Sequence, residues 1–135
     1  MANHSMTVRC VSCGRTFDGL TRACDDCPDS LLRAEYDAPF APADRPDIFK
    51  FLDWLPPSEA VETSVGPVVY RSEALADELG LDELWIGYNG YAPEKGARNM
   101  TGSFKDFEAL PTLLHMRENG APSVALASAG NTARA

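Results

Sequence analysis

The 135-residue chain has the length of a single domain and the composition of an ordinary globular protein, with 44% hydrophobic and 24% charged residues. It contains no apolar run of the ~20 residues that a membrane span needs and shows no secretory signal, so we expect a cytoplasmic protein without a membrane partner. The 20 acidic and 12 basic residues give a net charge of −8, which disfavours a nucleic-acid partner.

The four cysteines all lie near the N-terminus, in the pattern Cys10-x2-Cys13-x10-Cys24-x2-Cys27. In a reduced compartment, two C-x2-C pairs indicate a metal site rather than disulfides. Each pair forms a turn that directs two thiolates at one ion, and four thiolates complete a tetrahedral site. We therefore predict a zinc-ribbon-like unit over residues 7–35 with a structural zinc ion. The alternative is four cysteines that hold no metal.

The next segment, residues 36–67, contains six of the ten prolines. Proline fixes φ and has no N–H to donate, so we expect an extended segment rather than helix or sheet. The aromatic stretch IFKFLDWLP, which begins at Ile48, is expected to attach this segment to a core.

An α/β pattern occupies residues 68–135. Ser72 is a plausible N-cap and Gly80 fits the position just after a helix, so a first helix is expected between them. A second helix is expected to begin near Ser103, and Pro111 should kink it or split it in two. Strands are predicted at residues 68–71, 83–88 and 123–128, of which the last has the small apolar residues of a parallel sheet.

The two later strands and the helix between them predict a right-handed βαβ unit. The long segment before that helix, YNGYAPEKGARNM, is rich in turn residues and is expected to be a loop. Its two cations, Lys95 and Arg98, are candidate anion ligands, with solvated loop charges as the alternative.

Lys105 is expected to lie in the first turn of the second helix, which Ser103 caps. The positive end of the helix dipole disfavours an ammonium there and favours the neutral amine, which condenses with aldehydes. Taken alone, the residue also fits an exposed lysine at a helix start.

The segment SAGNT directly follows the strand at 123–128. Ligands of open α/β sheets lie beyond the carboxyl ends of strands, and a helix that starts there would direct free N–H groups at an anion. The alternative is a plain strand-to-helix turn. In one βαβ unit, Lys105 and this loop could face the same crevice.

The sequence TGSFKD, followed by ASAGNT, resembles the fold type II pyridoxal-phosphate enzymes of the threonine synthase and cysteine synthase superfamily. The resemblance implies that Lys105 forms the Schiff base with pyridoxal 5′-phosphate and that Asn131 hydrogen-bonds the ring hydroxyl of the cofactor. It also implies a loop that binds the substrate carboxylate, formed by Ser128, Ala129, Gly130 and Thr132.

Within this superfamily the chain departs from the threonine synthase pattern N-P-T-G-S-F-K-D-R-G, since Met100 replaces the proline and Phe107-Glu108 replaces Arg-Gly. The segments LWIGYNGYAPEKGARNMTGSFKDFEALPT, LLRAEY, FLDWLP and GPVVYRSEALADELGL are similar to those of cysteate synthases. That resemblance implies replacement of the phosphate of O-phospho-L-serine by sulfite, giving L-cysteate on a route to coenzyme M. The partners implied are a phosphoamino acid and sulfite, and the full-length enzyme is expected to be a homo-oligomer.

The chain ends at GNTARA, before the glycine-rich phosphate loop and most of the sheet of the resembled enzymes. We therefore expect an α/β fold in which a zinc-ribbon-like knuckle pair precedes the incomplete start of a fold type II parallel sheet. The chain is interpreted as an N-terminal fragment, inactive alone. Two alternatives stay open: a threonine synthase that acts on O-phospho-L-homoserine, and a non-catalytic zinc-ribbon binding protein.

Overall fold

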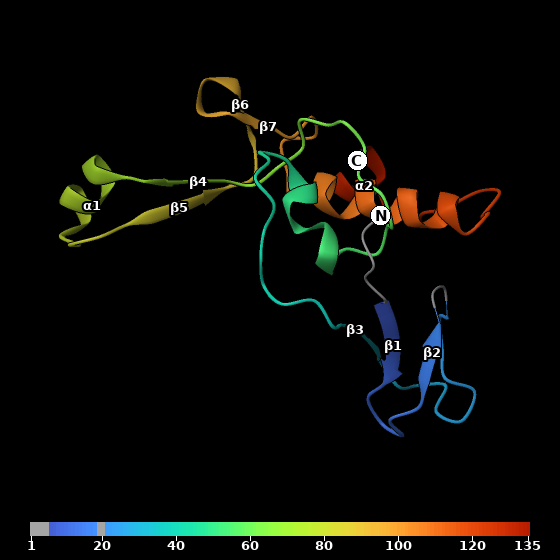
Figure 1. Ribbon diagram of the computed structural model, residues 1–135. Coiled ribbons are helices and arrows are strands. Elements are labelled where there is room, and N and C mark those ends of the chain that lie inside the picture. The colour runs from blue at the N-terminus through green and yellow to red at the C-terminus, as the bar shows by residue number, and fades with distance from the viewer. Residues whose placement is uncertain (1–5, 19–20) are drawn as a thin grey trace. The chain divides into compact units, whose positions relative to one another are not determined.

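The computed structural model describes residues 6–18 and 21–135 (Figure 1). The chain forms two compact units, each built from several segments. The first comprises the chain up to Ala43, Phe51–Ala60 and Pro111–Val124, and the second comprises Asp44–Lys50, Val61–Leu110 and Ala125–Ala135. The predicted division into residues 7–35, 36–67 and 68–135 stays a prediction.

A three-stranded antiparallel sheet carries the cysteine region in the first unit. Strand β1 (Met6–Cys10) lies between β2 (Thr16–Asp18) and β3 (Leu32–Tyr36). Val8 of β1 faces Phe17 on one side and Ala34 on the other, and its own side chain is buried. The β1–β3 register ends with Cys10 opposite Leu32, which places the first cysteine at the rim of the sheet.

The proline-rich segment contains a helical turn, η1 (Ile48–Trp54), so the expectation of extended chain throughout is wrong here. Asp47 explains the turn, because its carboxylate accepts a hydrogen bond from the Phe49 N–H at 2.9 Å and its carbonyl accepts one from Lys50 at 3.1 Å. Phe51 has φ −105° and ψ 23°, which interrupts the helical conformation. Phe49 is 1% exposed, so the aromatic stretch does reach a core, as predicted.

In the second unit, β4 (Val68–Arg71) and β5 (Trp85–Tyr88) pair as antiparallel strands, and α1 (Glu73–Leu79) lies in the connection between them (Figure 1). Gly80 ends α1 with φ 65°, and its N–H bonds Ala76 and Asp77 carbonyls, which confirms the predicted glycine stop. Ser72 occupies the N-cap position, although its side chain makes no capping hydrogen bond.

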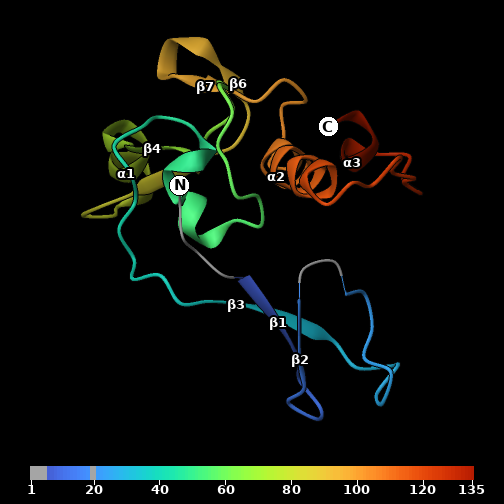
Figure 2. The same cartoon turned by 45° about the vertical axis from the view of Figure 1, so that its right-hand side comes forward.

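The segment predicted as a long loop contains a hairpin, which Figure 2 shows as the gold ribbon at the top of the view. Strand β6 (Tyr91–Ala92) pairs with β7 (Ala97–Arg98) across the short helix η2 (Pro93–Lys95). Gly96 closes the turn with φ 82°, a conformation that favours glycine.

Helix α2 (Lys105–Glu118) continues through Pro111, so of the two expected effects of this proline, a kink or a split, the split is wrong. Its Asp106, Pro111 and Leu114 are buried, whereas Phe104, which precedes it, is 56% exposed. Helix α3 (Asn131–Arg134) follows near the end of the chain. None of the helices in the described part of the chain is long and apolar enough to cross a membrane.

The parallel sheet is not observed: every strand pair in residues 6–18 and 21–135 is antiparallel. Residues 123–128, predicted as a buried strand, form no strand, and Val124 and Leu126 are 40% and 61% exposed. A strand needs a neighbour for its backbone N–H and C=O groups, and no described residue provides one for this segment. The predicted βαβ unit is therefore absent from the described residues.

Candidate functional site

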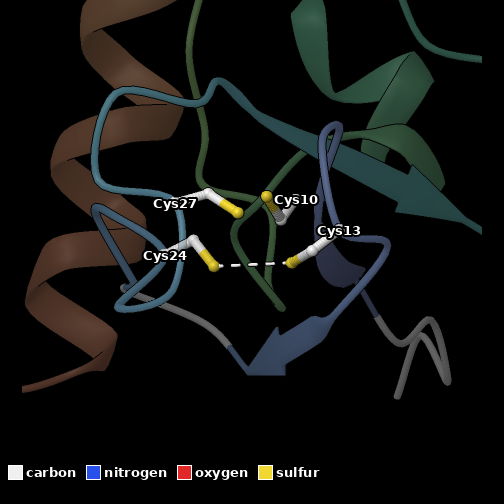
Figure 3. A group of neighbouring side chains, drawn as sticks. All are labelled: Cys10, Cys13, Cys24 and Cys27. Atoms are coloured by element: carbon white, nitrogen blue, oxygen red, sulfur yellow. Dashed lines mark hydrogen bonds between the residues drawn. The ribbon is translucent and has the colours of Figure 1, made fainter.

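The four cysteines converge at the end of the β1–β2–β3 sheet (Figure 3). Their four Sγ atoms all lie within 4.8 Å of one another, and the Sγ atoms of Cys13 and Cys24 are 3.6 Å apart. Four sulfurs at the zinc–sulfur distance of ~2.3 Å would lie ~3.8 Å apart in a tetrahedron. The cluster is therefore close to the geometry that a tetrahedral metal ion requires, and it could hold such an ion.

Backbone turns position the two cysteine pairs. The Gly14 N–H donates to the Cys10 carbonyl and the Cys10 N–H to the Arg15 carbonyl, both at 2.9 Å, and Gly14 has φ 74°. In the second pair, the Cys27 N–H donates to the Cys24 carbonyl at 3.2 Å. In each pair, the turn brings the second cysteine, three residues after the first, back beside it. The x2 spacing therefore lets both thiols of a pair reach one ion.

The thiols have unequal surroundings. Hydrogen bonding with the Ser30 hydroxyl, and then with the backbone of Cys13, lowers the pKa of Cys10 from 9.0 to about 6. Desolvation, followed by contact with Cys13, raises the pKa of Cys27 to about 12, and desolvation raises the pKa of Cys24 as well. Metal ligands are thiolates, so a bound metal ion would favour the charged form of all four sulfurs.

An ion pair links the two turns at the surface. The guanidinium of Arg15 donates to the Asp26 carboxylate at 3.0 Å and lies 5.2 Å above the Phe17 ring. Hydrogen bonding with Asp26 raises the pKa of Arg15. Both charged groups are at least half exposed, so we attribute little stability to the pair.

Lys105 begins α2, as predicted, and its backbone N–H donates to the Ser103 hydroxyl at 3.3 Å. Its side chain is 27% exposed; the Nζ atom pairs with the Glu108 carboxylate and lies 5.0 Å from the centroid of the Phe104 ring. The three-residue spacing explains the ion pair, since such residues share a helix face.

The loop before Lys105 is fixed by a buried polar network. The Thr101 N–H donates to the Asp106 carboxylate at 3.1 Å, and the Thr101 hydroxyl donates to the other oxygen of that carboxylate. Asn99 is fully buried. Its side-chain NH2 donates to the Asn89 carbonyl at 2.8 Å, and its backbone carbonyl accepts the Gly102 N–H at 2.9 Å. Hydrogen bonds therefore define the backbone on both sides of the turn that leads into α2.

The second predicted motif, residues 128–132, is held by hydrogen bonds within and just beyond itself. The Gly130 N–H donates to the Ser128 hydroxyl at 3.2 Å, and the Ala133 N–H donates to the Gly130 carbonyl at 3.1 Å. Ser128, Ala129, Gly130 and Asn131 are exposed, and Thr132 is half-buried. In the described part of the chain, the Lys105 side chain pairs with Glu108 of its own helix and not with this motif.

The structure adds residues that the sequence interpretation did not single out. Asp106 is buried and accepts a hydrogen bond from the Thr101 N–H, Glu108 pairs with Lys105, and Ser30 contacts Cys10. The i,i+3 spacing could have revealed Glu108. No local pattern connects Ser30 to Cys10, because 20 residues separate them and the sheet brings them together.

The candidate cations Lys95 and Arg98 both lie in the β6–β7 hairpin and are exposed. The Lys95 ammonium lies 4.5 Å from the centroid of the Tyr70 ring, a contact typical of a cation–π interaction. Their assignment as anion ligands stays a prediction.

Comparisons with known proteins bear on these sites. No family model matches the chain, and no solved structure matches it. The chain is 48% identical over 130 residues to a cysteate synthase of Methanosarcina mazei, 47% over 129 residues to one of Methanosarcina acetivorans, and 46% over 131 residues to one of Methanocella paludicola. These matches cover 95–96% of this chain, which confirms the resemblance inferred from the motifs. The chain spans only about 30–31% of the length of each of these relatives.

Proposed function

Because the chain is similar to cysteate synthases over nearly its whole length, we propose that it is part of an enzyme with that activity. The reaction we propose for the whole protein replaces the phosphate of O-phospho-L-serine with sulfite, releasing phosphate and forming L-cysteate. The observation that carries this proposal is the 48% identity over 96% of the chain, a stretch that includes the Lys105 segment. The working enzyme is proposed to be a homo-oligomer.

The cofactor we propose is pyridoxal 5′-phosphate, which when bound withdraws electrons from the Cα of an amino-acid substrate. The donor set fits such a group in part, since Lys105 offers a partly exposed primary amine at a position fixed by the Thr101–Asp106 hydrogen bonds. We propose that this amine binds the cofactor aldehyde and, once released by the substrate, accepts the Cα proton. In that role the neighbouring Glu108 carboxylate would stabilise the protonated amine.

The remaining polar groups have proposed roles in binding. Asn131 would hydrogen-bond the ring hydroxyl of the cofactor. The substrate carboxylate would bind to the exposed loop that contains Ser128, Ala129, Gly130 and Thr132. Gly130 supports this role, because a Cβ added there would meet no atom within 4 Å other than those of its chain neighbours. A ligand could therefore approach the backbone closely.

The cysteine cluster is proposed to bind one structural zinc ion through Cys10, Cys13, Cys24 and Cys27. The convergence of the four sulfurs within 4.8 Å supports it. Four thiolates leave no open coordination position, so the ion would stabilise the sheet end rather than take part in the chemistry.

The proposed function is tested with a protein of the relatives' length, incubated with O-phospho-L-serine and sulfite. We expect phosphate release and cysteate formation, measured by phosphate assay and mass spectrometry, together with the visible absorbance of a lysine-bound cofactor. The Lys105→Ala variant should lose both the absorbance and the activity, because its amine is the group proposed to bind the cofactor. Lys50→Ala, which removes a lysine that has no proposed role in the site, is the matched control for cofactor absorbance.

Each result that differs from these expectations would point to a different function or a different role for Lys105. Phosphate release from O-phospho-L-homoserine without cysteate formation would indicate a threonine synthase. Stoichiometric zinc without any cofactor absorbance would indicate a non-catalytic zinc-ribbon binding protein. An unchanged absorbance band in Lys105→Ala would overturn the lysine assignment alone.

A further inference from the structure

Two serine hydroxyls form a hydrogen-bond relay that ends at the first cysteine of the cluster. The Ser12 hydroxyl donates to the Ser30 hydroxyl oxygen at 2.9 Å, and Ser30 Oγ lies 3.3 Å from Cys10 Sγ. Cys10 is 1% exposed and Ser30 is half-buried, so the contact is partly shielded from water. Ser12, at the other end of the relay, is exposed to solvent.

The protons of this relay can be followed one by one when Cys10 carries its proton. The Cys10 thiol donates to the Ser30 oxygen, and the Ser30 hydroxyl donates its own proton to the Leu31 carbonyl at 3.2 Å. The Leu31 carbonyl also accepts the Val11 N–H at 3.1 Å. A carbonyl oxygen has two lone pairs, so both bonds can coexist.

Metal coordination changes this arrangement, because a metal-bound cysteine is a thiolate and has no proton to donate. The Ser30 hydroxyl then becomes the donor that can bridge to Cys10. When it turns from Leu31 to the thiolate, the Leu31 carbonyl keeps its bond from Val11 and is not left unpaired. Ser12 continues to donate to the Ser30 oxygen, which leaves the Ser30 proton free to point at sulfur.

We propose that Ser30 is a positioning residue of the metal centre: its hydroxyl donates a hydrogen bond to the Cys10 thiolate, and Ser12 orients it. This proposal rests on the metal site proposed above. A hydrogen bond to a charged acceptor is stronger than one between neutral groups, and it spreads part of the negative charge of a four-thiolate site onto a neighbouring group.

The test uses the chain itself with Co²⁺ as the probe, because cobalt–thiolate charge-transfer absorbance reports the sulfur directly. Apparent affinity is measured by competition with a chelator. Ser30→Ala should weaken cobalt binding about 10-fold, the lower end of the range for lost outer-shell partners, and should move the charge-transfer band to longer wavelength. The band moves because a thiolate without the hydrogen bond gives up an electron more easily. Ser12→Ala should produce the same changes to a smaller extent.

Ser30→Thr keeps the hydroxyl and should restore both affinity and band position, which separates hydrogen bonding from mere packing. Ser123→Ala, at an exposed serine in the same compact unit, is the matched control and should match the wild type. Wild-type affinity and band position in Ser30→Ala would overturn the proposal while the metal site stands. A wild-type chain that binds no cobalt would overturn both.

Discussion

Asp106 directly follows Lys105 and is 6% exposed. A carboxylate this deeply buried needs hydrogen-bond donors, and Thr101 supplies two, through its N–H and its hydroxyl. The Thr101 hydroxyl also contacts the Ser103 hydroxyl at 3.1 Å, and Ser103 accepts the Lys105 N–H. The hydrogen bonds of Asp106 therefore determine where the backbone of Lys105 lies.

Removing the Thr101 hydroxyl tests the importance of this bond. Thr101→Val keeps the shape of the side chain but leaves one Asp106 oxygen without its hydroxyl donor. We expect the free energy of unfolding to fall by ~1–3 kcal/mol, the penalty of an unsatisfied buried group. Urea denaturation of the chain measures the change. Thr7→Val, at a half-buried strand position, is the control, and equal stability of the two variants would contradict the expectation.

At the scale of elements, the β1–β3 pair places two arginines opposite each other. Arg9 and Arg33 are direct cross-strand neighbours, an arrangement that repels. Glu35 offsets the repulsion, since one carboxylate oxygen accepts from Arg9 at 2.8 Å and the other from Arg33 at 2.6 Å. Hydrogen bonding with Arg9, then with Arg33, lowers the pKa of Glu35 below 4.5.

This lowered pKa predicts the effect of Arg9→Gln. The pKa of Glu35 should rise toward 4.5, because its first partner is lost while Arg33 remains. Carboxyl-carbon NMR titration measures the shift, with Arg22→Gln, at an exposed arginine, as the control. A group whose folded-state pKa is lowered stabilises the fold above its unfolded pKa, and this contribution disappears as pH falls through the folded value. An unchanged Glu35 titration in Arg9→Gln would contradict the assigned ion pair.

The sequence predicts well those elements that are specified locally. Gly80 ends α1, and the C-x2-C spacing brings the two sulfurs of each pair together, because both features depend on backbone conformation over a few residues. Pairing direction depends on distant partners. The strand expected at 83–88, predicted to belong to a βαβ unit with residues 123–128, instead pairs antiparallel with β4 as β5, and residues 123–128 form no strand. The Ser30–Cys10 contact was missed for the same reason.

At the scale of the whole molecule, the apolar segment 123–128 has no strand neighbour among the described residues. Val124 and Leu126 are exposed, although their sequence is typical of a strand covered on both faces. The chain spans about 31% of the length of its Methanosarcina relatives, and in a protein of that length further strands could pair with this segment.

Hydrogen exchange of the 135-residue chain, compared with a protein of the relatives' length, tests this expectation. Backbone amides of residues 123–128 should exchange quickly in the short chain, since no described residue accepts a backbone hydrogen bond from them there. They should be protected in the long protein, because a paired strand exchanges only when it opens. Amides of β1 and β3, which are already paired, serve as the internal control and should exchange at similar rates in both. Fast exchange of residues 123–128 in both proteins would contradict the strand assignment and with it the expected parallel sheet.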